Sequence, residues 1–155
     1  MSKPEYIYCD SCVFLAYFKD ERDNADIVAS LLDEVQMDPN RKLLTSIFSI
    51  AEVAKAAADK SQTDSNLISI SDLDELWDNP LLVQLADFHI TLARMARDLV
   101  RKHSSLKAKD AVHLATAQLH DASVFFTYDK KLLRFSSEFD FDIVEPYLRQ
   151  LRLPE

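Results

Sequence analysis

The sequence of 155 residues contains no glycine. Phosphate-binding loops of the P-loop and GxGxxG kinds need glycine, because the backbone must approach the phosphate closely. The nucleotide-cofactor enzymes that are built on those loops are therefore excluded. Turns in this chain must form at Asn, Asp, Ser and Pro residues instead.

Cysteine and long apolar segments are also scarce. Only Cys9 and Cys12 are present; they cannot build a disulfide framework, which is typical of a reducing compartment. The sequence has no apolar run of membrane-spanning length, and its N-terminus lacks the charged and then apolar pattern of a signal peptide. We therefore expect a cytoplasmic protein that makes no contact with a membrane.

Basic residues are also few in comparison with acidic residues. Lys and Arg number 18 against 26 Asp and Glu, which gives a formal net charge of −8. This balance opposes general electrostatic binding to nucleic acid, but it is compatible with an enzyme that gathers acids in one metal-binding pocket. With 48% hydrophobic and 28% charged residues, the chain has the composition of a globular protein. Its length predicts one domain over residues 1–155.

Segments with strand and helix patterns alternate along the chain. This alternation is typical of a three-layer α/β/α fold with a central parallel sheet of about four or five strands. Between residues 60 and 78, a loop-like stretch and a short acidic helix are expected to form an insertion or a lid. The expected strands are 6–9, 42–45, 81–85, 123–127 and 141–145, and the other expected helices are 12–18, 24–37, 46–60, 91–103, 107–120 and 130–135.

Four acidic residues occupy places where parallel sheets build sites. In such sheets, ligands bind beyond the C-terminal ends of the strands. Asp10 and Asp129 follow two expected strands, whereas Glu52 and Asp110 lie on helices that approach the same edge. Both helical acids are bordered by small apolar residues, and a carboxylate in that setting needs a partner. Taken singly, each acid has an ordinary alternative as a helix cap, an ion pair or an exposed residue.

Together the four acids indicate a metal site. Neighbouring carboxylates repel one another unless cations are present, and oxygen ligands suit Mg²⁺ and Mn²⁺. A bound metal lowers the pKa of its water, polarises a phosphate and stabilises the leaving oxygen. The chemistry that this set of groups serves best is hydrolysis of a phosphodiester bond.

Four segments carry these acids in order and resemble one known family. They are similar to the PIN-domain nucleases, in particular to the small VapC-like toxins of toxin–antitoxin pairs. The D-A-x-H-L-A-T-A run is the most specific part of the resemblance. The segments are residues 7–15 (IYCDSCVFL), 45–53 (TSIFSIAEV), 106–117 (LKAKDAVHLATA) and 125–129 (FFTYD).

The resemblance implies a metal-dependent endoribonuclease that cuts RNA with Mg²⁺ or Mn²⁺ and has an antitoxin protein as its partner. Asp10 and Asp110 would be the direct metal ligands. Ser11 and Thr127 match positions where the family places a hydroxyl beside the acids, with a helix cap or a strand-end turn as the alternative role. The full set of catalytic and metal-binding acids implied in this way is Asp10, Glu52, Asp110 and Asp129.

Other polar residues near these segments have two interpretations each. His113 lies one helical turn beyond Asp110, so both could face the same side, and it fits either a catalytic base or a buried histidine that orients a neighbouring loop. Basic residues late in the chain could contact RNA phosphates without base specificity or form an ordinary solvated face. The four nearest the acids are Lys107, Lys109, Lys130 and Lys131, and the others are Arg94, Arg97, Arg101, Lys102 and Arg134.

Two other functions stay open. One is a PIN-like module that binds nucleic acid or a protein with little cleavage. The other is a redox or phosphatase-like enzyme that uses Cys12 or Asp10, since Cys9 and Cys12 form a C-x-x-C after a strand; the apolar strand before Cys12 favours packing roles for both thiols. Aromatic residues such as Phe48 and Trp77, if exposed, would suit a homodimer or an antitoxin helix.

Overall fold

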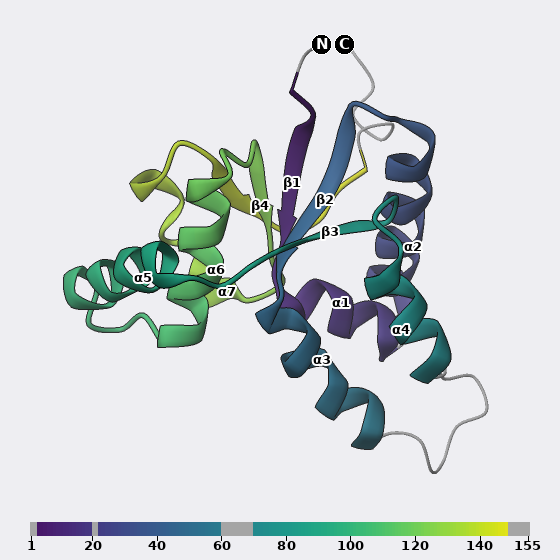
Figure 1. Cartoon of the computed structure of the whole chain (residues 1–155), viewed down its shortest axis with the longest axis horizontal. Coiled ribbons are helices and arrows are strands. Elements are labelled where there is room, and N and C mark those ends of the chain that lie inside the picture. Colours follow the sequence, from purple (N-terminus) through teal and green to yellow (C-terminus); the bar gives the residue numbers. More distant parts are fainter. Residues whose placement is uncertain (1–2, 20–21, 60–69, 149–155) are drawn as a thin grey trace.

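The computed structural model describes residues 3–19, 22–59 and 70–148 of the chain (Figure 1). Within these residues, helices alternate with strands throughout. The strands are β1 (Glu5–Cys9), β2 (Arg41–Ser46), β3 (Val83–Ala86), β4 (Val124–Phe126) and β5 (Asp142–Val144). The helices are α1 (Ser11–Phe18), α2 (Arg22–Met37), α3 (Phe48–Asp59), α4 (Ile70–Asp78), α5 (Ile90–Lys102), α6 (Ala108–Leu119), α7 (Lys130–Leu133) and the 3-10 helix η1 (Ser136–Glu138).

The strands form one parallel sheet in the order β3-β2-β1-β4-β5. β1 lies at the centre, where Tyr8 aligns with Leu44 of β2 on one side and with Phe125 of β4 on the other. The chain first extends the sheet from β1 to β3 and then returns to the other side of β1 to add β4 and β5. The strand order therefore reverses between β1 and β4, and in parallel sheets ligands bind beyond the C-terminal strand ends at such a position.

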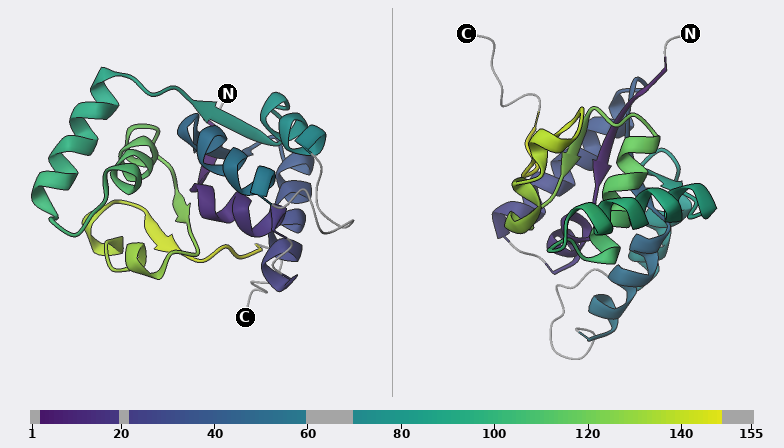
Figure 2. Two further views of the ribbon diagram at one scale, coloured as in Figure 1. Left: turned by 90° about the horizontal axis from the view of Figure 1, so that it is seen from below. Right: turned by 90° about the vertical axis from the view of Figure 1, so that its left-hand side faces the viewer.

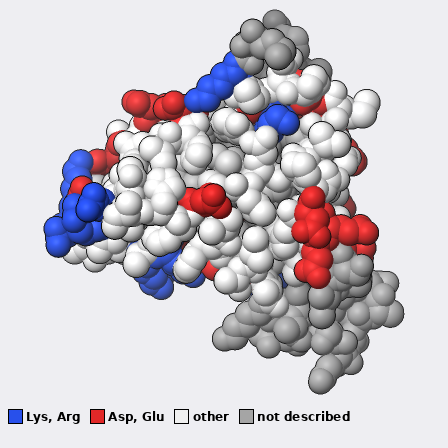
Figure 3. All heavy atoms as spheres, viewed as in Figure 1, with Lys and Arg blue, Asp and Glu red and all other residues white. Residues whose placement is uncertain are grey.

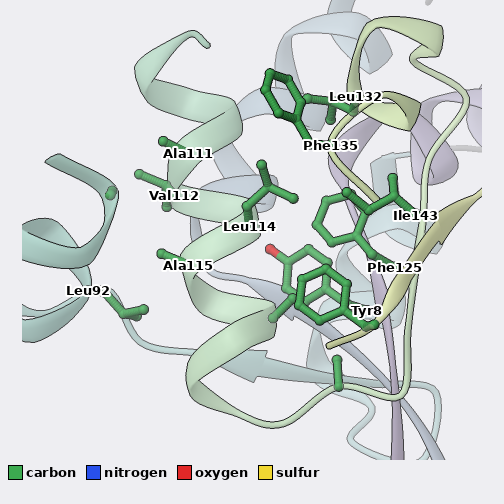
Figure 4. Packing of buried hydrophobic residues seen from close by; sticks show 14 of the residues in the cluster. Tyr8, Leu92, Ala111, Val112, Leu114, Ala115, Phe125, Leu132, Phe135 and Ile143 are labelled. Carbon is green, nitrogen blue, oxygen red and sulfur yellow. The ribbon is translucent and has the colours of Figure 1, made fainter. Parts of the chain in front are cut away.

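Helices cover both faces of the sheet and give it three layers. α5 and α6 lie on one face, and α1, α2 and α4 lie on the other (Figures 1 and 2). Successive side chains of a strand point to opposite faces, so Tyr8 packs with Leu114 in one core while Ile7 packs in the other. Figure 4 shows the first core, in which Phe125 stacks on Tyr8. The predicted three-layer α/β fold with a parallel sheet is confirmed.

The element boundaries differ from the predicted ones by a few residues. α3 begins at Phe48, two residues after its predicted start, because Ser46 still pairs with Ala86 in the sheet. The Ser46 hydroxyl then accepts the backbone N–H of Phe48 at 3.1 Å and helps to start the helix. α2 has 16 residues, and within the described segments no helix is long and apolar enough to cross a membrane.

The predicted insertion or lid falls partly outside the described residues. Residues 60–69 are not described, and the remainder of the 60–78 stretch is α4. Leu73 and Leu76 of α4 are buried in the second core, and Trp77 meets Phe14 edge to face with ring centroids 5.2 Å apart. α4 is therefore part of the helical layer.

A chain without glycine must use another residue wherever the backbone turns left-handed. Asp121, with a φ of 54°, is the one such residue within the described ranges. It follows the last turn of α6, where the Ala122 N–H donates to the Ala117 carbonyl at 3.0 Å and the Asp121 N–H donates to the Gln118 carbonyl at 3.2 Å. These two bonds form a Schellman motif, in which this position is usually glycine.

Candidate active site

Asp10 lies at the centre of the candidate site, directly after β1 and before α1. It is 4% exposed. Its Oδ2 accepts a hydrogen bond of 2.6 Å from the Thr127 hydroxyl, and its Oδ1 accepts one of 2.7 Å from the Cys12 thiol. Segments that are distant in the sequence thus hold one buried carboxylate, and neither donor carries a positive charge.

The Asp10 carboxyl is destabilised in its ionised form. Burial raises its pKa, because a charged carboxylate loses its hydration there. The charge of Asp110 raises the pKa further, whereas His113 and the hydrogen bonds from Cys12 and Thr127 act in the opposite direction. In the described part of the chain, no Lys or Arg forms an ion pair with Asp10. Such a carboxylate is a candidate ligand for a bound cation.

Thr127 connects Asp10 to Asp129. The buried Thr127 hydroxyl donates to Asp10 and accepts the backbone N–H of Asp129 at 3.0 Å. The Oδ1 of Asp129 accepts the backbone N–H of Lys131 at 3.0 Å and thereby caps α7. Thr127 therefore combines the two roles that its sequence position suggested, a contact to an acid and a strand-end turn.

Glu52 projects from α3 and has three polar neighbours. Its Oε1 lies 2.7 Å from Nε2 of His113, and its Oε2 accepts the Ser11 hydroxyl at 3.1 Å and lies 4.0 Å from Nζ of Lys109. Burial by itself would raise the pKa of Glu52, but these contacts outweigh it and hold the pKa below its ordinary value. The Glu52 carboxylate is therefore ionised at neutral pH and fixed in orientation.

Asp110 lies in the first turn of α6 and is half-buried. Burial, followed by the charge of Asp129, raises its pKa; Glu52 adds to this effect, and Lys109 opposes it. Asp10 responds to the charge of Asp110 in the same direction. Asp110 is therefore within range of the charges of the other three predicted acids.

The four acids do not form a ready-made metal cage. Within residues 3–19, 22–59 and 70–148, no three side chains of Asp, Glu, His or Cys are placed to hold a metal ion together. Mg²⁺, however, binds through one or two carboxylates and keeps several waters. The pKa values of Asp10 and Asp110 are raised, so a cation would stabilise these two carboxylates, and the donors fit Mg²⁺ or Mn²⁺ at Asp10 and Asp110.

The sequence matches the PIN domain family model over residues 7–138. The chain belongs to the PIN domain family. PIN domains are nucleases, and they generally use divalent metal ions. The matched span contains Asp10, Glu52, Asp110 and Asp129.

Several solved structures share this PIN domain's fold. VapBC-1 from nontypeable Haemophilus influenzae is 19% identical, with a TM-score of 0.63 over 90% of this chain and 97% of that chain. VapBC2 from Rickettsia felis, bound to a DNA fragment from its promoter, is 14% identical, with a TM-score of 0.62 over 92% and 99%. A toxin–antitoxin complex from Klebsiella pneumoniae is 18% identical, with a TM-score of 0.60 over 91% and 98%. Among curated proteins, none matches the chain.

Sequence reasoning did not find two residues of this PIN domain's site. Cys12, interpreted as a packing residue, contacts both Asp10 and Thr127, and its sulfur accepts the backbone N–H of Tyr128 at 3.2 Å. Tyr8, interpreted only as a strand residue, places its hydroxyl 2.5 Å from Nδ1 of His113. A tyrosine inside an apolar strand and a histidine inside an apolar helix both need buried polar partners, and that shared need is the signal that could have paired them.

The predicted RNA-binding lysines are exposed beside the acids of the PIN domain. Lys107 and Lys109 flank the start of α6, and Lys130 and Lys131 open α7. Figure 3 shows a larger gathering of Lys and Arg at the α5 end of the molecule and a gathering of Asp and Glu over α4. The negative net charge is therefore unevenly distributed, with basic side chains near the candidate site.

Proposed function

We propose that this PIN domain is a metal-dependent endoribonuclease that hydrolyses phosphodiester bonds in RNA. The observation that supports the proposal most is the buried Asp10 carboxylate beside Asp110, which lacks an ion pair with Lys or Arg in the described segments. A buried charge without a partner is costly. A bound divalent cation would offset that cost and would account for the placement of both carboxyls.

The four acids would have different roles in the site. Asp10 and Asp110 would hold Mg²⁺ or Mn²⁺, while Glu52 and Asp129 would add negative charge beside them. When bound, the ions supply charge that neutralises the phosphate and lowers the pKa of the attacking water. Thr127 keeps the Asp10 carboxylate at a fixed angle, and Ser11 does the same for Glu52.

The lysines would position the substrate. Lys107, Lys109, Lys130 and Lys131 are exposed at the starts of the two helices that carry or follow Asp110 and Asp129. Ammonium groups at these places would bind phosphates on either side of the reacting bond, without reading base sequence.

Cleavage of RNA by the purified protein tests this function. We expect cleavage with Mg²⁺ or Mn²⁺ and none in EDTA, and no cleavage of a DNA oligonucleotide of the same sequence. Asp10→Asn and Asp110→Asn should each lower kcat/KM by roughly a hundredfold or more, because a metal ligand and its charge are lost. Asp142→Asn is the matched control, since Asp142 is exposed on β5. Full activity in either of the first two variants would remove the nuclease mechanism.

We further propose that the chain is a toxin held by an antitoxin protein and that it forms a homodimer. The three similar structures come from VapBC and other toxin–antitoxin complexes. Exposed apolar side chains that follow β2 and β3, including Phe48 at 42% and Phe88 at 46% exposure, would suit a protein partner.

Expression should arrest growth, and the product of an adjacent reading frame or Asp110→Asn should relieve the arrest. Light scattering during gel filtration tests the homodimer.

Two alternatives have distinct outcomes. A PIN-like binding module would bind RNA or a protein but show no metal-dependent cleavage. A redox enzyme would lose its function in Cys9→Ser or Cys12→Ser. Burial, and then the charge of Asp10, raises the pKa of both thiols, which opposes the thiolate that redox chemistry needs.

A further inference from the structure

Tyr8, His113 and Glu52 form a line of hydrogen-bonded polar groups that runs from the core to the candidate site. The Tyr8 hydroxyl on the central strand β1 lies 2.5 Å from Nδ1 of His113 on α6. Nε2 of the same imidazole lies 2.7 Å from Oε1 of Glu52 on α3. Tyr8 is 0% and His113 is 1% exposed, so bulk water does not compete for the bond between these two side chains. Figure 4 shows Tyr8 directing its hydroxyl oxygen toward α6.

The available hydrogens set the direction of this line. A carboxylate accepts hydrogen bonds and cannot donate one, so the hydrogen between Nε2 of His113 and Oε1 of Glu52 belongs to Nε2. In a neutral imidazole only one ring nitrogen carries a hydrogen, so the Tyr8 hydroxyl donates to Nδ1 while its oxygen accepts the backbone N–H of Ser46 at 3.1 Å. Nδ1 is then an acceptor. Nε2 carries the ring hydrogen and donates it to Glu52.

We propose that Tyr8 is a positioning residue, whose hydroxyl holds His113 in the neutral Nε2–H tautomer and thereby orients Glu52. The inference rests on the proposed function, in which Glu52 belongs to the nuclease site. The hydrogen bond at one ring nitrogen decides which role the other nitrogen can take. Ser11 donates to the second Glu52 oxygen at 3.1 Å, so the two oxygens of the carboxylate are held by separate donors.

Packing alone does not require a hydroxyl at position 8. The Tyr8 ring stacks on Phe125 with centroids 5.0 Å apart, in a core that also holds Leu114 and Ile143. Phenylalanine would fill the same space. A phenylalanine at position 8, however, would leave Nδ1 of His113 without a donor. The imidazole could then exchange between tautomers, and Glu52 would lack the Nε2–H donor for part of the time.

The first measurement reads the tautomer directly, in protein without metal or RNA. Nitrogen chemical shifts of ¹⁵N-histidine-labelled protein show which ring nitrogen carries hydrogen, and His113→Gln identifies the His113 signals. Wild type and Tyr6→Phe should give the Nε2–H pattern, whereas Tyr8→Phe should give shifts averaged between tautomers. Tyr6 is the matched control, because it lies on β1 two residues earlier and packs against the same core. An Nδ1–H pattern in wild type, which needs no variant to fold, overturns the proposal, as does an unchanged pattern in folded Tyr8→Phe.

The second measurement connects the tautomer to the site. Tyr8→Phe should weaken Mn²⁺ binding and lower kcat by about tenfold each, with KM for RNA unchanged, and Tyr6→Phe should change neither. Wild type that has the Nε2–H tautomer but cleaves no RNA would refute the proposed function and, with it, the positioning role. Normal Mn²⁺ binding and kcat in a Tyr8→Phe variant with shifted tautomers would refute the positioning role alone.

Discussion

Asp10 shows at the scale of one residue how a site can oppose the stability of its own fold. Its carboxylate is buried, its hydrogen-bond donors are a neutral hydroxyl and a neutral thiol, and the charge of Asp110 repels it. Burial and the charge of Asp110 disfavour the charged form while no cation is bound, and the two neutral donors only partly offset this effect. Removing the charge should therefore stabilise the metal-free protein and remove its response to metal.

We expect Asp10→Asn to raise the metal-free melting temperature by roughly 2–4 °C, which corresponds to about 1 kcal/mol in a chain of this size. The amide oxygen can keep the bond from Thr127, while the cost of a buried charge disappears. Millimolar Mg²⁺ should raise the melting temperature of wild type but not that of the variant. Calorimetry in EDTA and in Mg²⁺ makes the comparison, and a lower metal-free melting temperature in the variant would contradict it.

The raised pKa of Asp10 also predicts how stability depends on pH. A carboxyl with a raised folded-state pKa contributes its full stability below about pH 4, and this contribution is lost as pH rises through the folded-state pKa. Glu52 has a lowered pKa and acts in the opposite direction. Because Glu52 is present in both proteins, subtracting the unfolding free energy of Asp10→Asn from that of wild type isolates Asp10. In EDTA this difference should fall as pH rises from 4.5 and then level off; a rising difference would refute the assignment.

At the scale of single elements, the helices and strands were predictable because their apolar periodicity is regular. The acids at strand ends and helix starts could also be placed at one sheet edge, since parallel strands end there. The roles of the individual acids could not be predicted from the sequence, because these roles depend on contacts between distant segments. Glu52 is held by His113, 61 positions away, and the Cys12 sulfur reaches Thr127, 115 positions away. No local pattern contains such pairings.

The cap of α7 offers a test that separates charge from hydrogen bonding at Asp129. Asp129 caps the helix by accepting the Lys131 N–H, and asparagine caps helices as well as aspartate does. Asp129→Asn should therefore leave the unfolding free energy unchanged, whereas Asp129→Ala should lower it by about 1 kcal/mol. Both should lose at least about tenfold in kcat if the charge supports the metal site. Urea unfolding and RNA cleavage measure the two effects, and an active Asp129→Asn would leave Asp129 with the cap alone.

The residue that follows the C-terminus of α6 is not the one that would give this helix end its greatest stability. Asp121 adopts a left-handed backbone there, which costs a residue with a Cβ more than it costs glycine. Its negative charge also follows a helix C-terminus, where the helix dipole disfavours it. Asp121→Gly should raise the unfolding free energy by about 0.5–1 kcal/mol, after allowance for the greater freedom of glycine in the unfolded chain. Asp121→Val should lower it, and equal stability of the two variants would argue against backbone strain.

At the scale of the whole molecule, an acidic protein must bind a polyanion through local rather than net charge. Replacing Lys130 and Lys131 together with alanine should raise KM for RNA and leave kcat nearly unchanged. Each phosphate contact that is lost should reduce the slope of log KM against log salt by about 0.7 for single-stranded RNA. Lys3→Ala is the control, because Lys3 precedes β1 and thus lies toward the N-terminal strand edge. An unchanged salt slope in the double variant would exclude both lysines from the RNA interface.

The central position of β1 has a consequence for the chain during its synthesis. The strand that is made first carries Asp10, but its partner β4, the Thr127 that holds Asp10 and the acids Asp110 and Asp129 all come from the last third of the sequence. A nascent chain still attached to the ribosome therefore contains the first acid long before it can assemble the set. The topology therefore delays assembly of the candidate site until the segment that carries Thr127 and Asp129 has left the ribosome.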